Sequence, residues 1–304
     1  MVESATFWRS YLRPSNLCMQ DSEPGTKKGL EHMEVVDHLQ QVSNFDLGPI
    51  ALVPTMGALH LGHAELIRQA KQFSDSVLVS IFVNPLQFDD PTDLEKYPRT
   101  PESDIAIARE SGARVLWVPE YNEIYPRPIE KIDAGHVGSL YEAAMRKGHF
   151  EGVLAVVKRL FDLVHPKWAL FGEKDFQQLF LIRQMVEDLD LGIEIVAVPT
   201  VRQADGLAIS SRNVRLSPQD LEVALVISRA LANASQMKSV DQMVQELNQS
   251  LSSEPGFKAE YAVIIDETDF SLATDATVRK RGLVAGWVNG VRLIDNMPMI
   301  GANR

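Results

Sequence analysis

Cysteine is nearly absent from this sequence: Cys18 is the only one in a chain of 304 residues. An intrachain disulfide needs two cysteines and a thiolate zinc cage needs several, so both kinds of site are excluded. Such sparse use of cysteine is typical of reducing compartments, and we therefore expect a cytoplasmic location.

Long apolar runs and an excess of positive charge are missing as well. No stretch approaches the roughly 20 apolar residues of a membrane-spanning helix, and the N-terminus lacks the apolar core of a secretory signal peptide. The formal net charge is -11 at pH 7. Nucleic acids and anionic membranes are themselves negative, so this charge disfavours both as partners, and anionic ligands must be bound by local features.

The N-terminal stretch differs from the remainder of the chain. Residues 1–17 contain Arg9 and Arg13, several hydroxyl residues and a single acid, so a mitochondrial transit peptide is a minor alternative to a featureless tail. Met33 lies shortly before the first convincing element. We expect residues 1–32 to be an N-terminal extension, with disorder and a start at Met33 as open alternatives.

From about residue 50 to residue 201, short apolar runs alternate with longer periodic ones, a pattern that predicts strands connected by helices. The nearly continuous apolar character of the runs indicates strands buried on both faces, as in a parallel sheet covered by helices. Strands are expected at 50–54, 77–83, 114–118, 168–171 and 193–198, and helices at 64–73, 102–111, 152–164 and 176–189. The sequence therefore predicts an α/β domain over 33–201.

The pattern changes after residue 201. Two helical stretches, 218–238 and 240–251, precede two alternating segments at 259–266 and 283–295. Asn289-Gly290 inside the second segment is typical of a tight hairpin turn. These features predict a second, smaller α+β domain over 202–304.

The segment PTMGALHLGH, residues 54–63, lies where a predicted strand ends and a helix begins. A helix N-terminus leaves backbone N–H groups unpaired and carries partial positive charge, so it stabilises a phosphate without a net basic patch. Gly57 and Gly62 allow close backbone approach, and His60 and His63 can donate to phosphate oxygens from the same side. The His-x-Gly-His turn resembles the signature of nucleotidyltransferases and class I aminoacyl-tRNA synthetases.

Two other interpretations of this histidine pair stay open from the residues alone. A zinc site would need a third ligand, and none stands at helical spacing. Two structural histidines would need no ligand at all. The sequence also lacks a Gly-x-Gly-x-x-Gly fingerprint and a Walker-type loop, which excludes the two commonest other phosphate sites.

Two further loops carry groups suited to a nucleotide. FGEKDFQQ, residues 171–178, follows another strand, where Lys174 offers a mobile charge for phosphate and Asp175 an acceptor for ribose hydroxyls. DGLAISSRN, residues 205–213, combines two serine hydroxyls with the forked guanidinium of Arg212, which suits a loop that closes over a triphosphate. A solvated helix cap and a plain interdomain loop are the respective alternatives.

A fourth segment, VNPLQF at 83–88, follows the second predicted strand. Asn84 and Gln87 are uncharged donors and acceptors of the kind that recognise hydroxyls and a carboxylate. The stretch YPRTP at 97–101 and the carboxylate of Asp104 come next. Taken separately, these would be ordinary loop residues.

Taken together and in this order, the segments resemble the pantothenate synthetase family. The resemblance rests on PTMGALHxGH, SIFVNPxQF, YPRT, FGEKDxQQ and DGLAxSSRN, and it extends to RLIDN at 292–296. It implies a Rossmann-like domain of the nucleotidyltransferase type, a C-terminal lid domain and a homodimer. It also implies an AMP-forming ligase of vitamin B5 biosynthesis, in which the pantoate carboxylate attacks the α-phosphate of ATP and β-alanine then attacks the pantoyl adenylate.

The resemblance also assigns roles to single residues. The catalytic residues, which would hold the phosphates, are His60, His63, Lys174, Ser210, Ser211 and Arg212. Further contacts to ATP would come from Met56, Gly57, Gly172, Asp175, Val201 and Ile209. The pantoate site would be lined by Met56, Asn84, Gln87 and Gln178. Mg²⁺ would accompany ATP, bridged mainly by its phosphates, with Asp104 as an open candidate ligand.

Two competing functions remain at this point. Another nucleotidyltransferase of the same fold would take a different acceptor, but the NPLQF and SSRN segments argue against it. A non-catalytic binding protein could retain the fold, but the presence of His60, His63, Lys174 and Arg212 argues against that.

Overall fold

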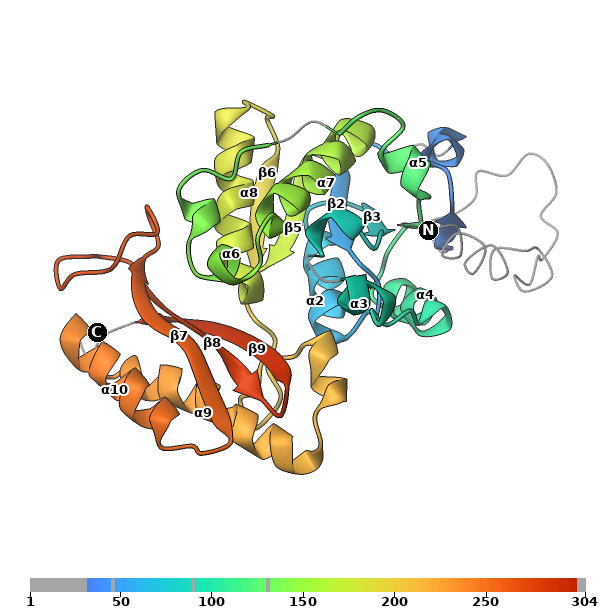
Figure 1. The fold of residues 1–304 in the computed structure, drawn as a ribbon. Coiled ribbons are helices and arrows are strands. Elements are labelled where there is room, and N and C mark those ends of the chain that lie inside the picture. Colours follow the sequence, from blue (N-terminus) through green and yellow to red (C-terminus); the bar gives the residue numbers. More distant parts are fainter. Residues whose placement is uncertain (1–31, 45–46, 89–90, 130–131, 300–304) are drawn as a thin grey trace. The chain divides into compact units, whose positions relative to one another are not determined.

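The computed structural model describes residues 32–44, 47–88, 91–129 and 132–299, so the predicted extension lies outside the described residues except for His32. These residues form two compact units. The first comprises the chain up to Phe171 together with Gln178–Val198, and the second comprises Gly172–Gln177 together with the chain from Pro199 onwards. Each unit has its own sheet (Figure 1).

The sheet of the first unit has six strands. They are β1 (Glu34–Val36), β2 (Ile50–Thr55), β3 (Ser76–Ile81), β4 (Val115–Trp117), β5 (Trp168–Gly172) and β6 (Glu194–Val198). The spatial order is β1-β4-β3-β2-β5-β6, and β2 pairs in parallel with both β3 and β5. Every residue of β3 is buried, as the apolar runs predicted. The expected parallel α/β sheet is confirmed.

Seven α-helices of four residues or more accompany this sheet in the described chain. They are α2 (Leu61–Ala70), α3 (Pro91–Glu95), α4 (Pro101–Glu110), α5 (Tyr121–Ile124), α6 (Glu142–Met145), α7 (His149–Val164) and α8 (Phe176–Asp188). Short 3-10 turns add η2 (Leu39–Asn44), η3 (Pro85–Gln87) and η4 (Val137–Ser139), whereas η5 (Glu173–Asp175), between β5 and α8, belongs to the second unit. The four long helices match the sequence prediction, whereas α3, α5, α6 and β1 were not predicted.

Strand order explains where a ligand site belongs in the first unit. The chain winds outward from β2 through β3 to β4 and then returns to place β5 on the other side of β2. The order therefore reverses between β2 and β5. In open α/β sheets, ligands bind beyond the carboxyl ends of the strands at such a reversal. The segment that follows Thr55 leaves the sheet at this point.

The second unit contains a three-stranded antiparallel sheet and two long helices (Figure 1). Its elements are η6 (Ser211–Arg215), α9 (Pro218–Ala234), α10 (Val240–Ser252), β7 (Phe257–Asp266), β8 (Lys280–Val288) and β9 (Val291–Met299). The helices bury Leu231 and Leu247 against Val284 of the sheet. The smaller α+β arrangement is confirmed.

The turn between β8 and β9 forms where the sequence places it. Asn289 and Gly290 are the two loop residues, and both have positive φ, 44° and 75°. Positive φ at both positions is the geometry that a two-residue hairpin requires and that Asn-Gly tolerates.

The domain boundary predicted at 201/202 stays a prediction. Within the described ranges, no helix is long and apolar enough to cross a membrane.

Candidate active site

His60 and His63 form a reciprocal cap at the first turn of α2. The His60 Nδ1 accepts a hydrogen bond from Gly62 N at 3.1 Å, and the His63 Nδ1 accepts one from His60 N at 3.2 Å. An Nδ1 that accepts carries no proton, so each neutral ring holds its proton on Nε2 and presents an N–H donor there. The two rings lie 4.1 Å apart between centroids. The pair thus offers two N–H donors at the positive end of a helix.

Asp104 holds the turn that leads into this cap. The carboxylate is fully buried, and it accepts hydrogen bonds from Ala58 N at 3.1 Å and Leu59 N at 2.7 Å. Thr100 donates a third through Oγ1 at 2.9 Å. Burial raises the pKa of Asp104, although the three hydrogen bonds oppose that shift. These hydrogen bonds hold the turn in place, and the metal-ligand role left open for Asp104 from the sequence stays a prediction.

The same turn requires glycine at one position. Gly57 has φ +83°, and a Cβ there would lie 3.1 Å from the Asp104 carboxylate and 3.1 Å from the Ile81 side chain. Ala58 also adopts positive φ, 49°. Two successive left-handed residues turn the chain sharply out of β2, which aims the backbone N–H groups of Ala58 and Leu59 at Asp104.

Met56, Gln87 and Asn84 form a connected group beside this turn. The Gln87 amide donates to Met56 Sδ at 2.8 Å, and Asn84 Nδ2 lies 3.3 Å from Gln87 Oε1. Asn84 is fully buried, and its amide also donates to Gly152 O at 2.9 Å and accepts from Tyr125 OH at 3.2 Å. Burial raises the pKa of Tyr125 well above its ordinary value, so the phenol remains a neutral donor. These contacts hold the side chain of Asn84 against that of Gln87.

The start of α7 supports Gln87 from the backbone side. His149 Nδ1 lies 2.9 Å from Gln87 O. Gly152 approaches so closely that a Cβ would lie 2.3 Å from Leu86 O and 2.9 Å from Gln87 N. Only glycine permits this contact between α7 and η3, because the atoms that block a side chain belong to the backbone.

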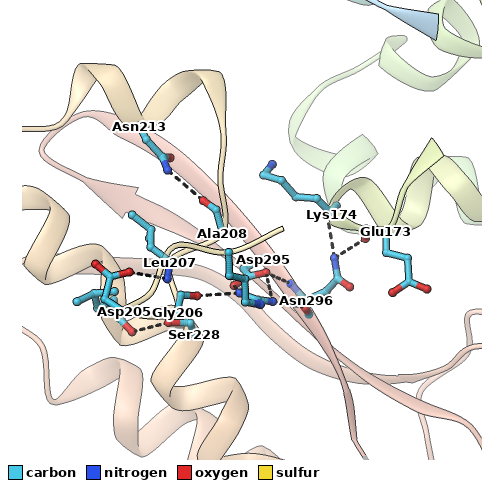
Figure 2. Close-up of polar contacts among 12 residues, drawn as sticks. Glu173, Lys174, Asp205, Gly206, Leu207, Ala208, Asn213, Ser228, Asp295 and Asn296 are labelled. Carbon is cyan, nitrogen blue, oxygen red and sulfur yellow. Dashed lines mark hydrogen bonds and ion pairs between the residues drawn. The ribbon is translucent and has the colours of Figure 1, made fainter. Parts of the chain in front are cut away.

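In the second unit, the Lys174 segment rests on β9. Figure 2 shows the amide of Asn296 facing the backbone of Glu173 and Lys174, while the Lys174 side chain points away from it. Asn296 Nδ2 donates to both carbonyl oxygens at 2.9 Å. Arg281 lies 3.4 Å from the Glu173 carboxylate and stacks over Phe176, 3.9 Å from the ring centroid. The three-residue turn η5 is therefore held through two of its carbonyl oxygens, through the Glu173 carboxylate and through Phe176, the residue that follows it.

The serine and arginine loop follows a small hairpin in the same unit. Arg202 and Ala208 form an isolated antiparallel bridge, and Ile209 N donates to Val201 O at 3.0 Å. Ser210 then caps η6 by accepting from Arg212 N at 3.2 Å. Asn213 Nδ2 donates back to Ala208 O at 3.0 Å (Figure 2). This arrangement fixes the backbone from which Ser210, Ser211 and Arg212 project.

The structure divides the predicted site residues between the two units. The first unit holds Met56, Gly57, His60, His63, Asn84, Gln87 and Gln178, whereas the second holds Gly172, Lys174, Asp175, Val201, Ile209, Ser210, Ser211 and Arg212. Gln178 is half-buried in the first turn of α8. Residues that sequence reasoning missed include Gly152, His149 and Arg202. Asp295 and Asn296 were seen only within a motif, although two buried polar neighbours in an apolar strand are an unusual signal.

Fold and site together define a class of protein. A helix start that carries two imidazole donors stands at the reversal point of a parallel sheet, and the chain also carries a Gly-Glu-Lys-Asp turn and a Ser-Ser-Arg loop. These features are typical of a Rossmann-like protein of the nucleotidyltransferase type, which acts on the phosphates of ATP.

Comparisons with known proteins narrow this class. A family model described as pantoate-beta-alanine ligase matches residues 30–298. A pantothenate synthetase of Acidothermus cellulolyticus is 44% identical over 261 residues, which are 83% of this chain and 86% of the relative. The chain belongs to the pantoate-beta-alanine ligase family, and its activity is the ATP-dependent condensation of pantoate with β-alanine. The family and activity expected from the sequence are confirmed.

Solved structures of the same family have a similar fold. A pantothenate synthetase from Thermus thermophilus superposes with a TM-score of 0.83 at 40% identity, covering 88% of this chain and 99% of that one. A pantoate-beta-alanine ligase from Francisella tularensis, solved with beta-gamma ATP and beta-alanine, gives a TM-score of 0.74 at 34% identity and covers 88% of this chain and 98% of its own. The two competing functions are thereby set aside.

Proposed function

We propose that the condensation runs through a pantoyl adenylate. A pantoate carboxylate oxygen attacks the α-phosphorus of ATP, and the bond to the β-phosphate oxygen breaks to release pyrophosphate. The amine of β-alanine then attacks the acyl carbon, AMP leaves, and the amine loses a proton. A carboxylate is already ionised at neutral pH, so the first step needs no general base and depends on positioning and on stabilising the phosphate charge.

His60 and His63 carry the proposal for the phosphates. Each ring accepts at Nδ1 from backbone N–H, which fixes its Nε2–H as a donor that needs no reorganisation when negative charge develops. Lys174, Ser210, Ser211 and Arg212 are assigned to the phosphates as further donors. Gly172 and Asp175 contact the ribose in this proposal, and Val201 and Ile209 line the nucleotide site.

The pantoate site is assigned to Met56, Gln87 and Gln178. Gln87 is buried and held through its side chain and its carbonyl oxygen, so its amide is preorganised. Asn84 already uses both amide donors and its acceptor within the protein. We therefore assign Asn84 to positioning Gln87, which revises the direct contact expected from the sequence.

Mg²⁺ accompanies ATP in this proposal. Among the residues that the structure describes, no group of three or more His, Cys, Asp or Glu side chains is placed to hold a metal ion. An ion held mainly by phosphate oxygens and water needs no such group. When bound, the ion would offset charge on the departing pyrophosphate.

Three further expectations stay predictions: the homodimer, the lid role of residues 202–304 and the cytoplasmic location. Sedimentation would test the homodimer.

Isotope exchange tests the adenylate route. With ATP, Mg²⁺ and pantoate but no β-alanine, labelled pyrophosphate should enter ATP, because the first step is reversible on the enzyme. Omitting pantoate should abolish the exchange. Exchange that required β-alanine would contradict a separate adenylate step.

The phosphate assignment has its own test. His60→Ala and Lys174→Ala should each lower the rate of adenylate formation by about 100-fold, while pantoate binding changes little, because the lost donors act on developing charge. Single-turnover assays would measure the first quantity and calorimetry the second. Pyrophosphate release at the unaltered rate from either variant would overturn that residue's role.

A further inference from the structure

Two neighbouring residues of β9 contact both phosphate-binding segments of the second unit. Asn296 touches the Lys174 turn, and Asp295 reaches the hairpin before Ser210 through Arg202. Both are buried, with exposed fractions of 5% for Asp295 and 4% for Asn296. The other buried residues of β9 are apolar, so a buried polar pair in this strand needs an explanation beyond packing.

Asn296 uses its whole amide for this contact. Both Nδ2 hydrogens point to consecutive carbonyl oxygens, those of Glu173 and Lys174, and Oδ1 accepts from Arg281 at 2.6 Å. Arg281 is oriented in turn by Glu267, whose carboxylate lies 2.7 Å from Nε. No other side chain of similar size offers two donors and one acceptor in this arrangement.

Asp295 acts on the other segment. Arg202 donates to the two Asp295 oxygens at 2.6 and 2.9 Å, a bidentate pair with a defined orientation. The same guanidinium donates to Gly206 O at 3.1 Å, in the turn of the hairpin, and to Asn296 O at 3.1 Å. One arginine thus connects β9 to the hairpin that leads to Ser210.

The two contacts are linked directly to each other, because Asn296 N donates a hydrogen bond to Asp295 Oδ1 at 2.8 Å. We propose that Asp295 and Asn296 are positioning residues that hold the Lys174 turn and the Ser210 loop in one fixed arrangement. This inference rests on the proposed roles of Lys174 and Arg212 toward phosphate. It extends them, because the cations are placed together by one strand rather than separately by their own loops.

Asn296→Asp is the sharpest test. The change preserves shape and the acceptor for Arg281, but it replaces the two N–H donors with an oxygen that faces two carbonyl oxygens. Adenylate formation at saturating ATP and pantoate should fall by about 100-fold, because a displacement of about 1 Å in a catalytic group has effects of that size. Asn248→Asp is the matched control, since that amide also donates to a backbone carbonyl, Val244 O at 2.8 Å, on an exposed face of the same unit.

A double-mutant cycle separates positioning from stability. If Asn296 acts through Lys174, then Asn296→Asp should cost less than about 3-fold in a Lys174→Ala background. Rates are measured per folded enzyme, well below the unfolding temperature. A full additional 100-fold loss in the double variant, or an unaltered rate in Asn296→Asp alone, would overturn the inference. If Lys174→Ala itself had no effect, the proposed function of that lysine would fail instead.

Arg202→Lys keeps the inference testable if Asn296→Asp does not fold. Lysine retains the charge but cannot form the bidentate pair or reach Gly206 O at the same time. Adenylate formation should fall by about 10-fold, and the loss should disappear in an Arg212→Ala background. Independent effects of the two changes would contradict a shared arrangement.

Discussion

At the scale of single residues, His60 caps α2 and, in the proposed function, also donates to phosphate, and one substitution can separate the two roles. His60→Asn keeps a side-chain acceptor for Gly62 N, and asparagine is a favoured helix cap, so the free energy of unfolding should change by less than about 1 kcal/mol. The Nε2–H donor is lost, and adenylate formation should fall by about 100-fold. Urea unfolding and single-turnover assays measure the two quantities. An active His60→Asn variant would show that the cap, not the donor, matters.

Asp104 gives a second prediction at this scale. Asp104→Asn places an NH₂ group where Ala58 N or Leu59 N needs an acceptor, leaving a buried donor unpaired. The free energy of unfolding should fall by about 2 kcal/mol. Thr100→Ala, which removes only a hydroxyl donor to the same carboxylate, should cost about 1 kcal/mol. Equal losses in the two variants would contradict this account.

The pH dependence of Asp104 has a definite sign. Burial raises the pKa of this carboxyl from its ordinary 3.8, so the folded chain holds the proton more tightly than the unfolded chain does. The stabilising contribution of that proton is complete below pH 3.8 and is lost as the pH rises through the raised pKa. The stability difference between the native chain and Asp104→Asn should therefore be larger at about pH 4 than at about pH 7. A difference that grew with pH would contradict the direction of the shift.

At the scale of elements, the contact of α7 with η3 is the most restrictive. Gly152→Ala would place Cβ 2.3 Å from Leu86 O, so the backbone before Gln87 has to move. The KM for pantoate should rise by about 10-fold, and the free energy of unfolding should fall by about 1–3 kcal/mol. Steady-state kinetics with pantoate as the varied substrate would measure the first effect. Glu151→Ala, on the exposed side of the same helix, should leave both unaltered.

The long elements could be predicted because their apolar pattern is local. β2, β3 and α7 follow apolar runs or periodic stretches that are visible in the sequence alone. Three-residue β1 and four-residue α5 and α6 are too short to establish a period, and they exist because neighbouring elements supply partners. β1, for example, pairs with β4 across a sequence separation of about 80 residues, which no local pattern reveals.

For the candidate site, the sequence indicates where the residues lie along the chain but not the contacts that hold them. His60 and His63 stand at a strand-to-helix junction, which sequence locates, but their tautomers follow from the hydrogen bonds of the capped turn. The supports of the site are remote in sequence. Asn296 contacts Lys174 from 122 residues away, and His149 contacts Gln87 from 62 residues away. Such pairs are set by tertiary packing, so only the structure could identify them.

At the scale of the whole molecule, the second unit includes Gly172–Gln177, a segment that lies in the sequence between two parts of the first unit. Residues 199–299 produced alone would lack Gly172–Gln177, and so would expose Phe270 where Phe176 stacks at 6.1 Å. Asn296 would also lose two carbonyl acceptors. Joining Gly172–Gln177 to this fragment through a flexible linker should raise its free energy of unfolding by about 2 kcal/mol, measured by circular dichroism in urea. A linked segment with Phe176→Ala is the control, and equal stability with and without the segment would contradict this dependence.

The same connectivity restricts how the chain can recombine with its relatives. The polypeptide passes between the two units three times, at 171/172, 177/178 and 198/199. A chimera made by one crossover at 198/199 would therefore take the Lys174 turn from one parent and the strand beneath it from another. If the parents differ at Glu173, Phe176 or Arg281, the contacts of Arg281 with Glu173 and Phe176 would then join residues from two different proteins. The unit of exchange in this protein is consequently not a continuous stretch of gene, and successful hybrids must carry the six-residue insert with its distant C-terminal strand.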